Sequence, residues 1–183
     1  MKPTELLLHE HRVIERGIAS IEVQARRLDA GQGVRPGFFL DAADFIQGFA
    51  DACHHRKEEG VLFERLIAAG SPRRGGPVAV MLAEHEQGRV FTRAMRRAAE
   101  QLAQGDASAA GAVTSSALGY AALLRSHIQK EEGILFPLAD TIIPSDQYDE
   151  MLAEFERIEE VETGAGVHEK YLALLESMEH EAA

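Results

Sequence analysis

The sequence has very little of the residues that mark several protein classes. It contains one cysteine, Cys53, which excludes an internal disulfide and is typical of a reducing compartment. We therefore expect a cytoplasmic protein. Basic residues are scarce relative to acidic ones, 19 against 30, which gives a formal net charge of −11. Because general binding to nucleic acid requires net positive charge, we expect no nucleic-acid partner.

Long apolar runs are also missing. No stretch approaches the ~18–20 apolar residues of a membrane span. The start, MKPTELLLHEHR, has only three consecutive leucines before charge returns, so we expect neither a signal peptide nor a membrane segment. Hydrophobic residues make up 45% and charged residues 27% of the 183 residues, which is typical of one folded, soluble globular domain.

Alternating strand patterns are absent, and helix-forming residues fill the segments between clusters of glycine and proline. These segments predict four long helices, near 3–30, 38–69, 77–104 and 107–140, and two shorter ones, near 145–162 and 167–181. Short connections favour antiparallel neighbours. The predicted fold is all-α, an up-down-up-down four-helix bundle over 1–140 with a C-terminal helical extension over 141–183.

A histidine occupies a core position on each of the four long helices. On the first helix, apolar residues recur at spacings of three and four, and His11 falls on that stripe. His85 and His127 fall on the equivalent stripes of the third and fourth helices, and His54 lies on the less regular stripe of the second. Buried polar groups require compensation, so these positions call for a partner within the core.

Two nearly identical strings extend the pattern, HHRKEEGVLF from His54 and HIQKEEGILF from His127. In each string a glutamate, Glu58 or Glu131, follows the histidine by four residues and shares its helix face. Imidazole and carboxylate without thiolate suit iron, manganese, zinc or cobalt. We therefore predict two metal ions in the bundle core, each with two histidine nitrogens and both bridged by the glutamates, from the set His11, His54, Glu58, His85, His127 and Glu131.

The order of the ligands separates this site from two other helical metal sites. Ferritin-like bundles use Glu-x-x-His, and no histidine here has glutamate three residues before it. The His-Glu-x-x-His string of zinc metalloproteases is absent as well.

The two strings, with EHRVI around His11 and EHEQGR around His85, resemble the hemerythrin-like, or HHE cation-binding, proteins. The resemblance covers roughly residues 1–140 and implies two iron ions, bridged by an oxo or hydroxo group and by the two glutamates. The chain departs from the oxygen carriers at Met81, where they have a further histidine, and at Glu131, where they usually have aspartate. The iron–sulfur repair relatives have a histidine in the region matching 20–40, and this chain has none. The resemblance therefore implies a site with open positions.

Two further histidines are candidates for an additional ligand. His168, in the predicted extension, could fold over the open end of the bundle. His55 is rotated by about 100° from its neighbour on an α-helix, so it would reach the site only from its edge. The alternative for both is a surface or helix-terminal position. Cys53 and Tyr120 are expected to be core residues.

The resulting hypothesis is a non-haem di-iron protein that binds or senses oxygen, nitric oxide or peroxide, with manganese or zinc as alternative metals. Several other functions stay open. The same centre could belong to an enzyme that turns over peroxide or nitric oxide, or serve iron storage or iron–sulfur repair. The chain could also be an interaction module whose histidines bind adventitious zinc. Neither catalytic turnover nor the oligomeric state follows from the sequence.

Overall fold

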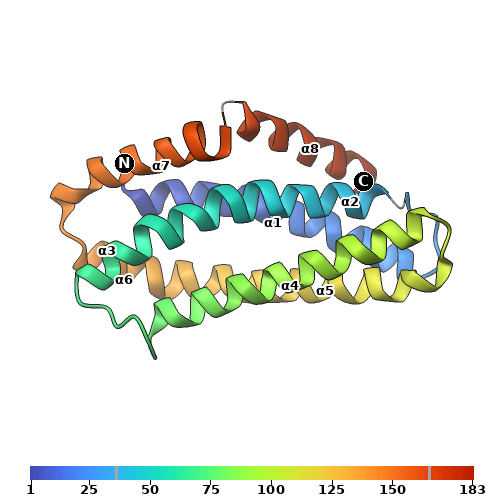
Figure 1. Cartoon of the computed structure of the whole chain (residues 1–183), viewed down its shortest axis with the longest axis horizontal. Coiled ribbons are helices and arrows are strands. Elements are labelled where there is room, and N and C mark those ends of the chain that lie inside the picture. Colours follow the sequence, from blue (N-terminus) through green and yellow to red (C-terminus); the bar gives the residue numbers. More distant parts are fainter. Residues whose placement is uncertain (36, 165) are drawn as a thin grey trace.

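The computed structural model describes residues 1–35, 37–164 and 166–183, except for the side chains of residues 162 and 163, and every regular element in those ranges is helical. Four long helical segments lie side by side (Figure 1). The first and third are the continuous helices α1 (Pro3–Asp29) and α4 (Pro77–Ala103). The all-α prediction is confirmed within the described residues.

The second and fourth long segments are composite. The second consists of α2 (Gly37–Phe45), η1 (Ile46–His55), η2 (Glu58–Leu62) and α3 (Phe63–Ala68). The fourth, after the short 3₁₀ turn η3 (Ala107–Ala109), consists of α5 (Ala110–Lys130), η4 (Glu131–Leu135) and α6 (Phe136–Ile142).

The elements η1, η2 and η4 are π-helical, with wider turns than an α-helix. Two of them begin at the glutamates of the repeated strings, Glu58 and Glu131, so the same sequence produces the same local widening twice. π-Helical turns inside α-helices occur frequently at functional sites. They also change which side chains face the interior, which matters for the site described below.

Proline and glycine set the ends of the two continuous helices. Pro3 and Pro77 stand in the first helical turn, where the missing N–H leaves no hydrogen bond unmade. Gly31 and Gly105 follow α1 and α4 with φ of 70° and 96°. Only glycine adopts this region readily, so the chain leaves both helices where the sequence predicts.

Two apolar clusters fill the interior, and the predicted ligands lie between them. On α1, Leu7 belongs to one cluster and Ile14 to the other, with His11 between them. On the fourth segment the two clusters come in the opposite order along the chain, because Leu124, which precedes His127, belongs to the cluster of Ile14. The histidines therefore form a polar layer across the bundle, walled by hydrophobic side chains on both sides.

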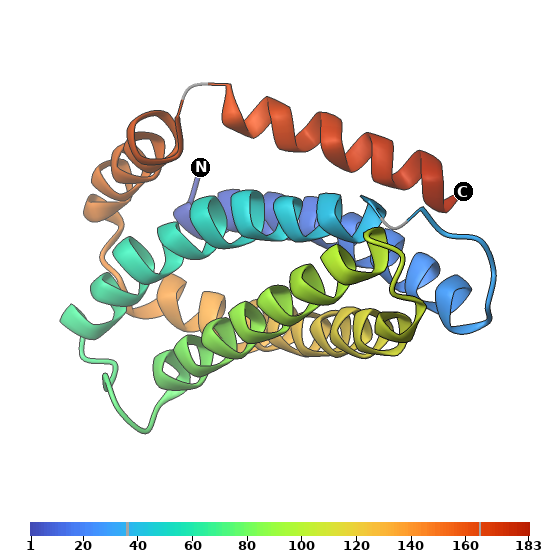
Figure 2. The same cartoon turned by 45° about the vertical axis from the view of Figure 1, so that its right-hand side comes forward.

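The C-terminal residues add α7 (Tyr148–Arg157), preceded by the 3₁₀ turn η5 (Ser145–Gln147), then the π-helical η6 (Ile158–Gly164) and α8 (Val167–Ala182). Figure 2 shows α8 lying along α1 and α2, and residue contacts agree. Phe155 of α7 joins one apolar cluster and Leu175 of α8 the other. The extension therefore contributes to the same interior as the four long segments.

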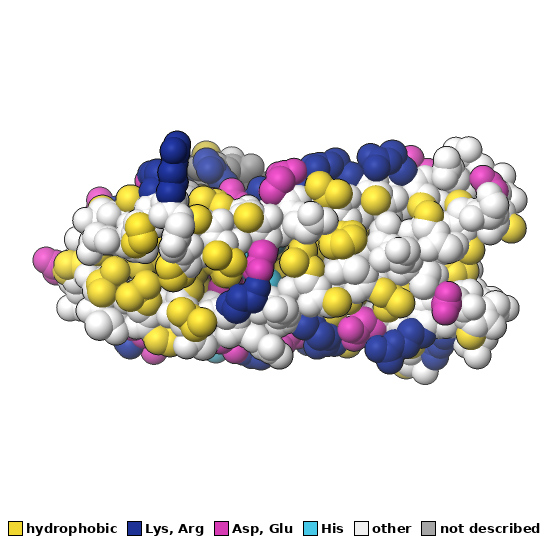
Figure 3. Space-filling view, turned by 90° about the horizontal axis from the view of Figure 1, so that it is seen from below, with side chains coloured by type: hydrophobic (Ala, Val, Ile, Leu, Met, Phe, Trp, Pro, Cys, Tyr) yellow, Lys and Arg dark blue, Asp and Glu magenta, His cyan; other side chains and the backbone are white. Residues whose placement is uncertain are grey.

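One helical stretch, Ala107–Ile142, is long and apolar enough to cross a membrane by length and composition alone. We expected no membrane segment, and this stretch does not argue for one. It packs against α1 and α4, and it carries His127 and Glu131 in the interior. Figure 3 shows acidic and basic side chains mainly along the edges of one face and also near its middle, with hydrophobic side chains between them and histidine visible only in small spots.

Candidate metal centre

The six predicted ligands converge at one place in the bundle. Each of the six residues has at most 1% of its surface exposed, and each of the four long segments contributes at least one of them: His11, His54, Glu58, His85, His127 and Glu131. Such burial is unusual for histidine and glutamate unless these groups are paired or bind metal.

The two carboxylates lie between two pairs of histidines. Glu131 places Oε2 3.2 Å from His11 Nε2 and Oε1 3.2 Å from His127 Nε2. Glu58 places Oε1 3.5 Å from His54 Nε2 and Oε2 3.4 Å from His85 Nε2. Each carboxylate therefore offers one oxygen to the His11/His54 half of the site and the other to the His85/His127 half.

The two carboxylates lie close to histidine nitrogens but form no hydrogen bonds with the described residues. Among the described residues, none of the four oxygens of Glu58 and Glu131 has a hydrogen-bond partner, and neither has His11 Nε2. Buried carboxylate oxygens require a positive partner. Four imidazole nitrogens and four carboxylate oxygens around one centre fit the donor preferences of iron, manganese or zinc. The residues therefore fit the metal pair implied by the sequence.

The opposite ring nitrogen of each histidine, Nδ1, is held by a second carboxylate. The four distances are 3.0 Å for His11 to Glu132, 2.8 Å for His54 to Glu10, 2.8 Å for His85 to Glu59, and 2.9 Å for His127 to Glu84. A carboxylate at Nδ1 selects the tautomer with its proton there and leaves the Nε2 lone pair directed at the centre.

These four outer carboxylates connect the long segments in a ring. Each is adjacent in sequence to one predicted ligand, yet it binds a histidine of the next segment. The carboxylate of α1 binds the histidine of the second segment, that of the second segment binds the histidine of α4, that of α4 binds the histidine of the fourth segment, and that of the fourth segment binds the histidine of α1. None of the four was among the predicted ligands. The available signal was the Glu-His and Glu-Glu pairs at 10–11, 84–85, 58–59 and 131–132.

A cation binds each outer carboxylate. The pairs are Arg12 with Glu132, Lys57 with Glu10, Arg89 with Glu59, and Lys130 with Glu84. Burial raises the pKa of Glu10, but hydrogen bonds with His54 and Lys57 act in the opposite direction and leave the pKa below its usual value. The pKa of Glu59 is lowered in the same way by His85 and Arg89, against the effect of burial. Both groups are therefore ionised acceptors at neutral pH.

His55 lies in the interior, not at the edge of the site as expected. Its side chain is 3% exposed, and its ring centroid is 3.9 Å from that of His85. Together with Glu58 and His127, the two form a group whose ligand atoms lie within 4.8 Å of one another. Burial, with the nearby charge of His85, lowers the pKa of His55 well below its usual value. The expectation was wrong because it assumed α-helical rotation, whereas η1 is π-helical as far as His55.

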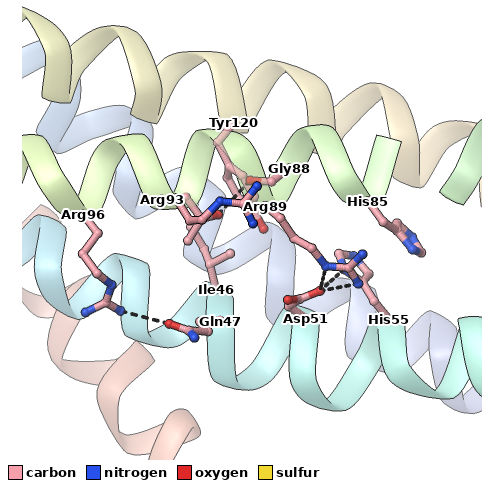
Figure 4. A pocket seen from close by; sticks show the side chains of 11 residues that line it. Ile46, Gln47, Asp51, His55, His85, Gly88, Arg89, Arg93, Arg96 and Tyr120 are labelled. Carbon is pink, nitrogen blue, oxygen red and sulfur yellow. Dashed lines mark hydrogen bonds and ion pairs between the residues drawn. The ribbon is translucent and has the colours of Figure 1, made fainter. Parts of the chain in front are cut away.

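A pocket of about 280 Å³ opens beside the His55/His85 half, between η1, α4 and α5 (Figure 4). Arg89 and Asp51 lie on its wall and are joined by an ion pair of 2.7 Å. Tyr120, a predicted core residue, is 1% exposed and also lines the pocket. Its hydroxyl has no hydrogen-bond partner among the described residues. The pocket therefore borders this half of the site at His55 and His85.

His168 does not reach the four-helix cluster. It lies with Cys53 and Glu159 in a separate group, with its ring 5.1 Å from that of Phe49. The interpretation of His168 as a ligand that closes the open end of the bundle is therefore not supported by its position. Cys53 is buried, as expected, and burial raises the pKa of its thiol to about 12.

Comparisons with known proteins identify the family of the chain. Residues 2–139 match the Hemerythrin HHE cation binding domain. The chain is 25% identical over 152 residues to uncharacterized proteins of Mycobacterium tuberculosis (strains H37Rv and CDC 1551) and Mycobacterium bovis, which covers 83% of this chain. It spans about 59% of the length of these relatives. No solved structure matches the chain. Since the family match covers most of its length, the chain belongs to the hemerythrin HHE cation-binding domain family, with His/Glu clusters suited to metal ions.

Proposed function

We propose that the protein is a non-haem di-iron protein of hemerythrin type that binds or senses oxygen, nitric oxide or peroxide. One observation carries the proposal. Glu58 and Glu131 each direct one oxygen to the His11/His54 pair and the other to the His85/His127 pair. Two carboxylates with this orientation are suited to bridge two cations.

We also propose the architecture that holds the site. The four long segments form an up-down-up-down bundle over residues 1–140, and residues 141–183 form an extension. His11 and His54 would hold one ion, His85 and His127 would hold the other, and both glutamates would contribute oxygens to the two. Iron, when bound, supplies reversible one-electron chemistry and coordination positions for a small ligand. The single buried Cys53 supports a cytoplasmic location.

The chain's own residues prepare the site for this role. The outer carboxylates hold each imidazole at Nδ1 so that Nε2 stays directed inward. The two apolar clusters limit access of water from both ends of the bundle. The pocket beside His55 and His85 provides access from the side. A small uncharged ligand can therefore enter a site that is otherwise enclosed.

Metal analysis of the purified protein tests the proposal. The wild type is expected to contain two irons per chain, and Glu58→Ala or Glu131→Ala one or none, because each glutamate contacts both halves. Glu86→Ala is the matched control, since the side chain of Glu86 is 60% exposed and outside the cluster. Retention of two irons by either core variant, with unchanged helical circular dichroism, would contradict the bridging role. If protein purified from cells grown in iron-rich medium contains manganese or zinc in place of iron, the metal assignment is contradicted.

The alternative is an enzyme that turns over peroxide or nitric oxide. The pocket supports it, because about 280 Å³ leaves room for a small substrate and water molecules together beside the site. Stopped-flow mixing of the diferrous protein with oxygen, nitric oxide or peroxide separates the two functions. A stable adduct at one equivalent supports binding or sensing, and repeated turnover with excess peroxide or nitric oxide supports the enzyme.

A further inference from the structure

His55 is a buried imidazole that has no role in the proposed function. Its ring stacks on His85 at 3.9 Å between centroids with an interplanar angle of 15°, and it meets His127 edge-on at 5.9 Å. Its ligand atoms fall in the same group as those of Glu58, His85 and His127. It therefore lies at the His85/His127 half of the site and adds a fifth imidazole to the cluster.

Neither ring nitrogen of His55 has a hydrogen-bond partner among the described residues. A core position that requires only an aromatic ring is better filled by phenylalanine, because burying two unpaired polar atoms costs free energy. Phe63 stacks on the same His85 ring at 5.8 Å, so this environment does accept phenylalanine. Packing alone therefore does not account for a histidine at this position.

Like the other four histidines, His55 has a carboxylate beside Nδ1, although this one comes from its own helix and lies beyond hydrogen-bond distance. Asp51, one turn earlier, places Oδ1 3.5 Å from His55 Nδ1. Arg89 binds Asp51 and also Glu59, at 2.7 Å each, and Glu59 holds His85. One guanidinium therefore supports the carboxylates of two neighbouring imidazoles, as Figure 4 shows for Asp51. The Nδ1 of His55 faces its carboxylate, and Nε2 is the nitrogen left for the cluster.

We propose that His55 is a metal ligand, which supplies a third imidazole nitrogen to the ion held by His85 and His127. The identity of that ion rests on the proposed function. The two halves then differ in donor number. Three imidazoles and two carboxylate oxygens face one ion, and two imidazoles and two carboxylate oxygens face the other. The half with His11 and His54 therefore has more positions for an exchangeable ligand.

Metal titration of the metal-free protein tests this assignment, with zinc as the probe and a colorimetric chelator as competitor. For His55→Phe and His55→Gln, one of the two sites is expected to weaken by at least about 100-fold, since even changes to outer partners of a ligand cost 10–100-fold. The other site is expected to change by less than tenfold. His180→Gln, at an exposed histidine, is the matched control and should leave both affinities unchanged.

Thermal unfolding of the metal-free variants separates a ligand from a packing residue. If His55 is a ligand, His55→Phe leaves the melting temperature of the metal-free protein unchanged or higher, because it removes two unpaired polar atoms. Two sites of wild-type affinity in both His55 variants would overturn the assignment and leave the proposed function intact. A wild type without any metal affinity would overturn both.

Discussion

Lys57 is fully buried, and its replacement is expected to be among the most damaging single substitutions in the bundle. Its ammonium group binds Glu10, which holds His54 Nδ1 at 2.8 Å, and Glu159 of η6. The ion pair therefore connects one histidine of the centre to the C-terminal extension. Lys57→Met keeps the length and the apolar stem of the side chain but leaves the Glu10 carboxylate buried without its cation.

Removal of one partner from a buried ion pair costs about 3–5 kcal/mol. We expect Lys57→Met to lower the free energy of unfolding of the metal-free protein by that amount. For a chain of this length, about 2–4 °C of melting temperature corresponds to 1 kcal/mol, so the melting temperature should fall by roughly 6–20 °C. Urea unfolding followed by circular dichroism measures the change. Addition of Glu10→Gln should recover part of the loss, because it removes the stranded charge.

Lys2→Met is the matched control. Lys2 forms an ion pair with Asp140 at 2.7 Å, but its side chain is 46% exposed, and exposed pairs contribute about 0–1 kcal/mol. If Lys57→Met costs no more than Lys2→Met, the ammonium of Lys57 does not hold Glu10 as described. A double variant less stable than Lys57→Met alone would also contradict this role of Lys57.

Three further changes test other parts of the structure. Tyr120→Phe should stabilise the protein by about 1–3 kcal/mol in urea unfolding, because the buried hydroxyl has no hydrogen-bond partner among the described residues. Tyr148→Phe, at a half-buried tyrosine, is the control and should not stabilise the protein. A loss of stability in Tyr120→Phe would show that the hydroxyl is hydrogen-bonded. Gly48→Ala should cost about 1–3 kcal/mol and expose α8 to protease, since its Cβ would lie 1.8 Å from the Tyr171 ring, and addition of Tyr171→Ala should restore the stability. Chelation of the metal should lower the melting temperature but leave the helical circular dichroism intact, because both apolar clusters consist of side chains that do not bind metal. Loss of helix on chelation would refute this.

Much of the fold was predictable because proline and glycine mark the helix ends in the sequence. The third helix was expected near 77–104 and spans Pro77–Ala103, and the first was expected near 3–30 and spans Pro3–Asp29. The convergence of the six ligands was predictable for a second reason. Each lies on the core stripe of its own helix, and stripes on packed helices meet in the middle.

His55 and the outer carboxylates could not be predicted in the same way. The position of His55 depends on the π-helical turns of η1, which helix periodicity at 100° per residue does not describe. The partner of each outer carboxylate depends on which segments are neighbours. Glu10 stands next to His11 in the sequence, yet it binds His54 of another segment. Helix propensity and spacing contain no information about that choice.

The ring of carboxylates gives a physical reason for the full length of the repeated strings. Adjacent side chains point in different directions around a helix axis, so when one side chain faces the bundle axis, its neighbour faces the adjacent helix. A Glu-Glu pair such as Glu58-Glu59 therefore provides one ligand for the centre and one brace for the histidine of the next segment, and the pair Glu131-Glu132 does the same. On the other two segments, Glu-His pairs divide the roles in the same way. Because the braces close a ring, a histidine can turn away from the centre only by breaking a charge-assisted bond to a neighbouring helix, so the packing of the bundle itself orients the nitrogens that would bind the metal.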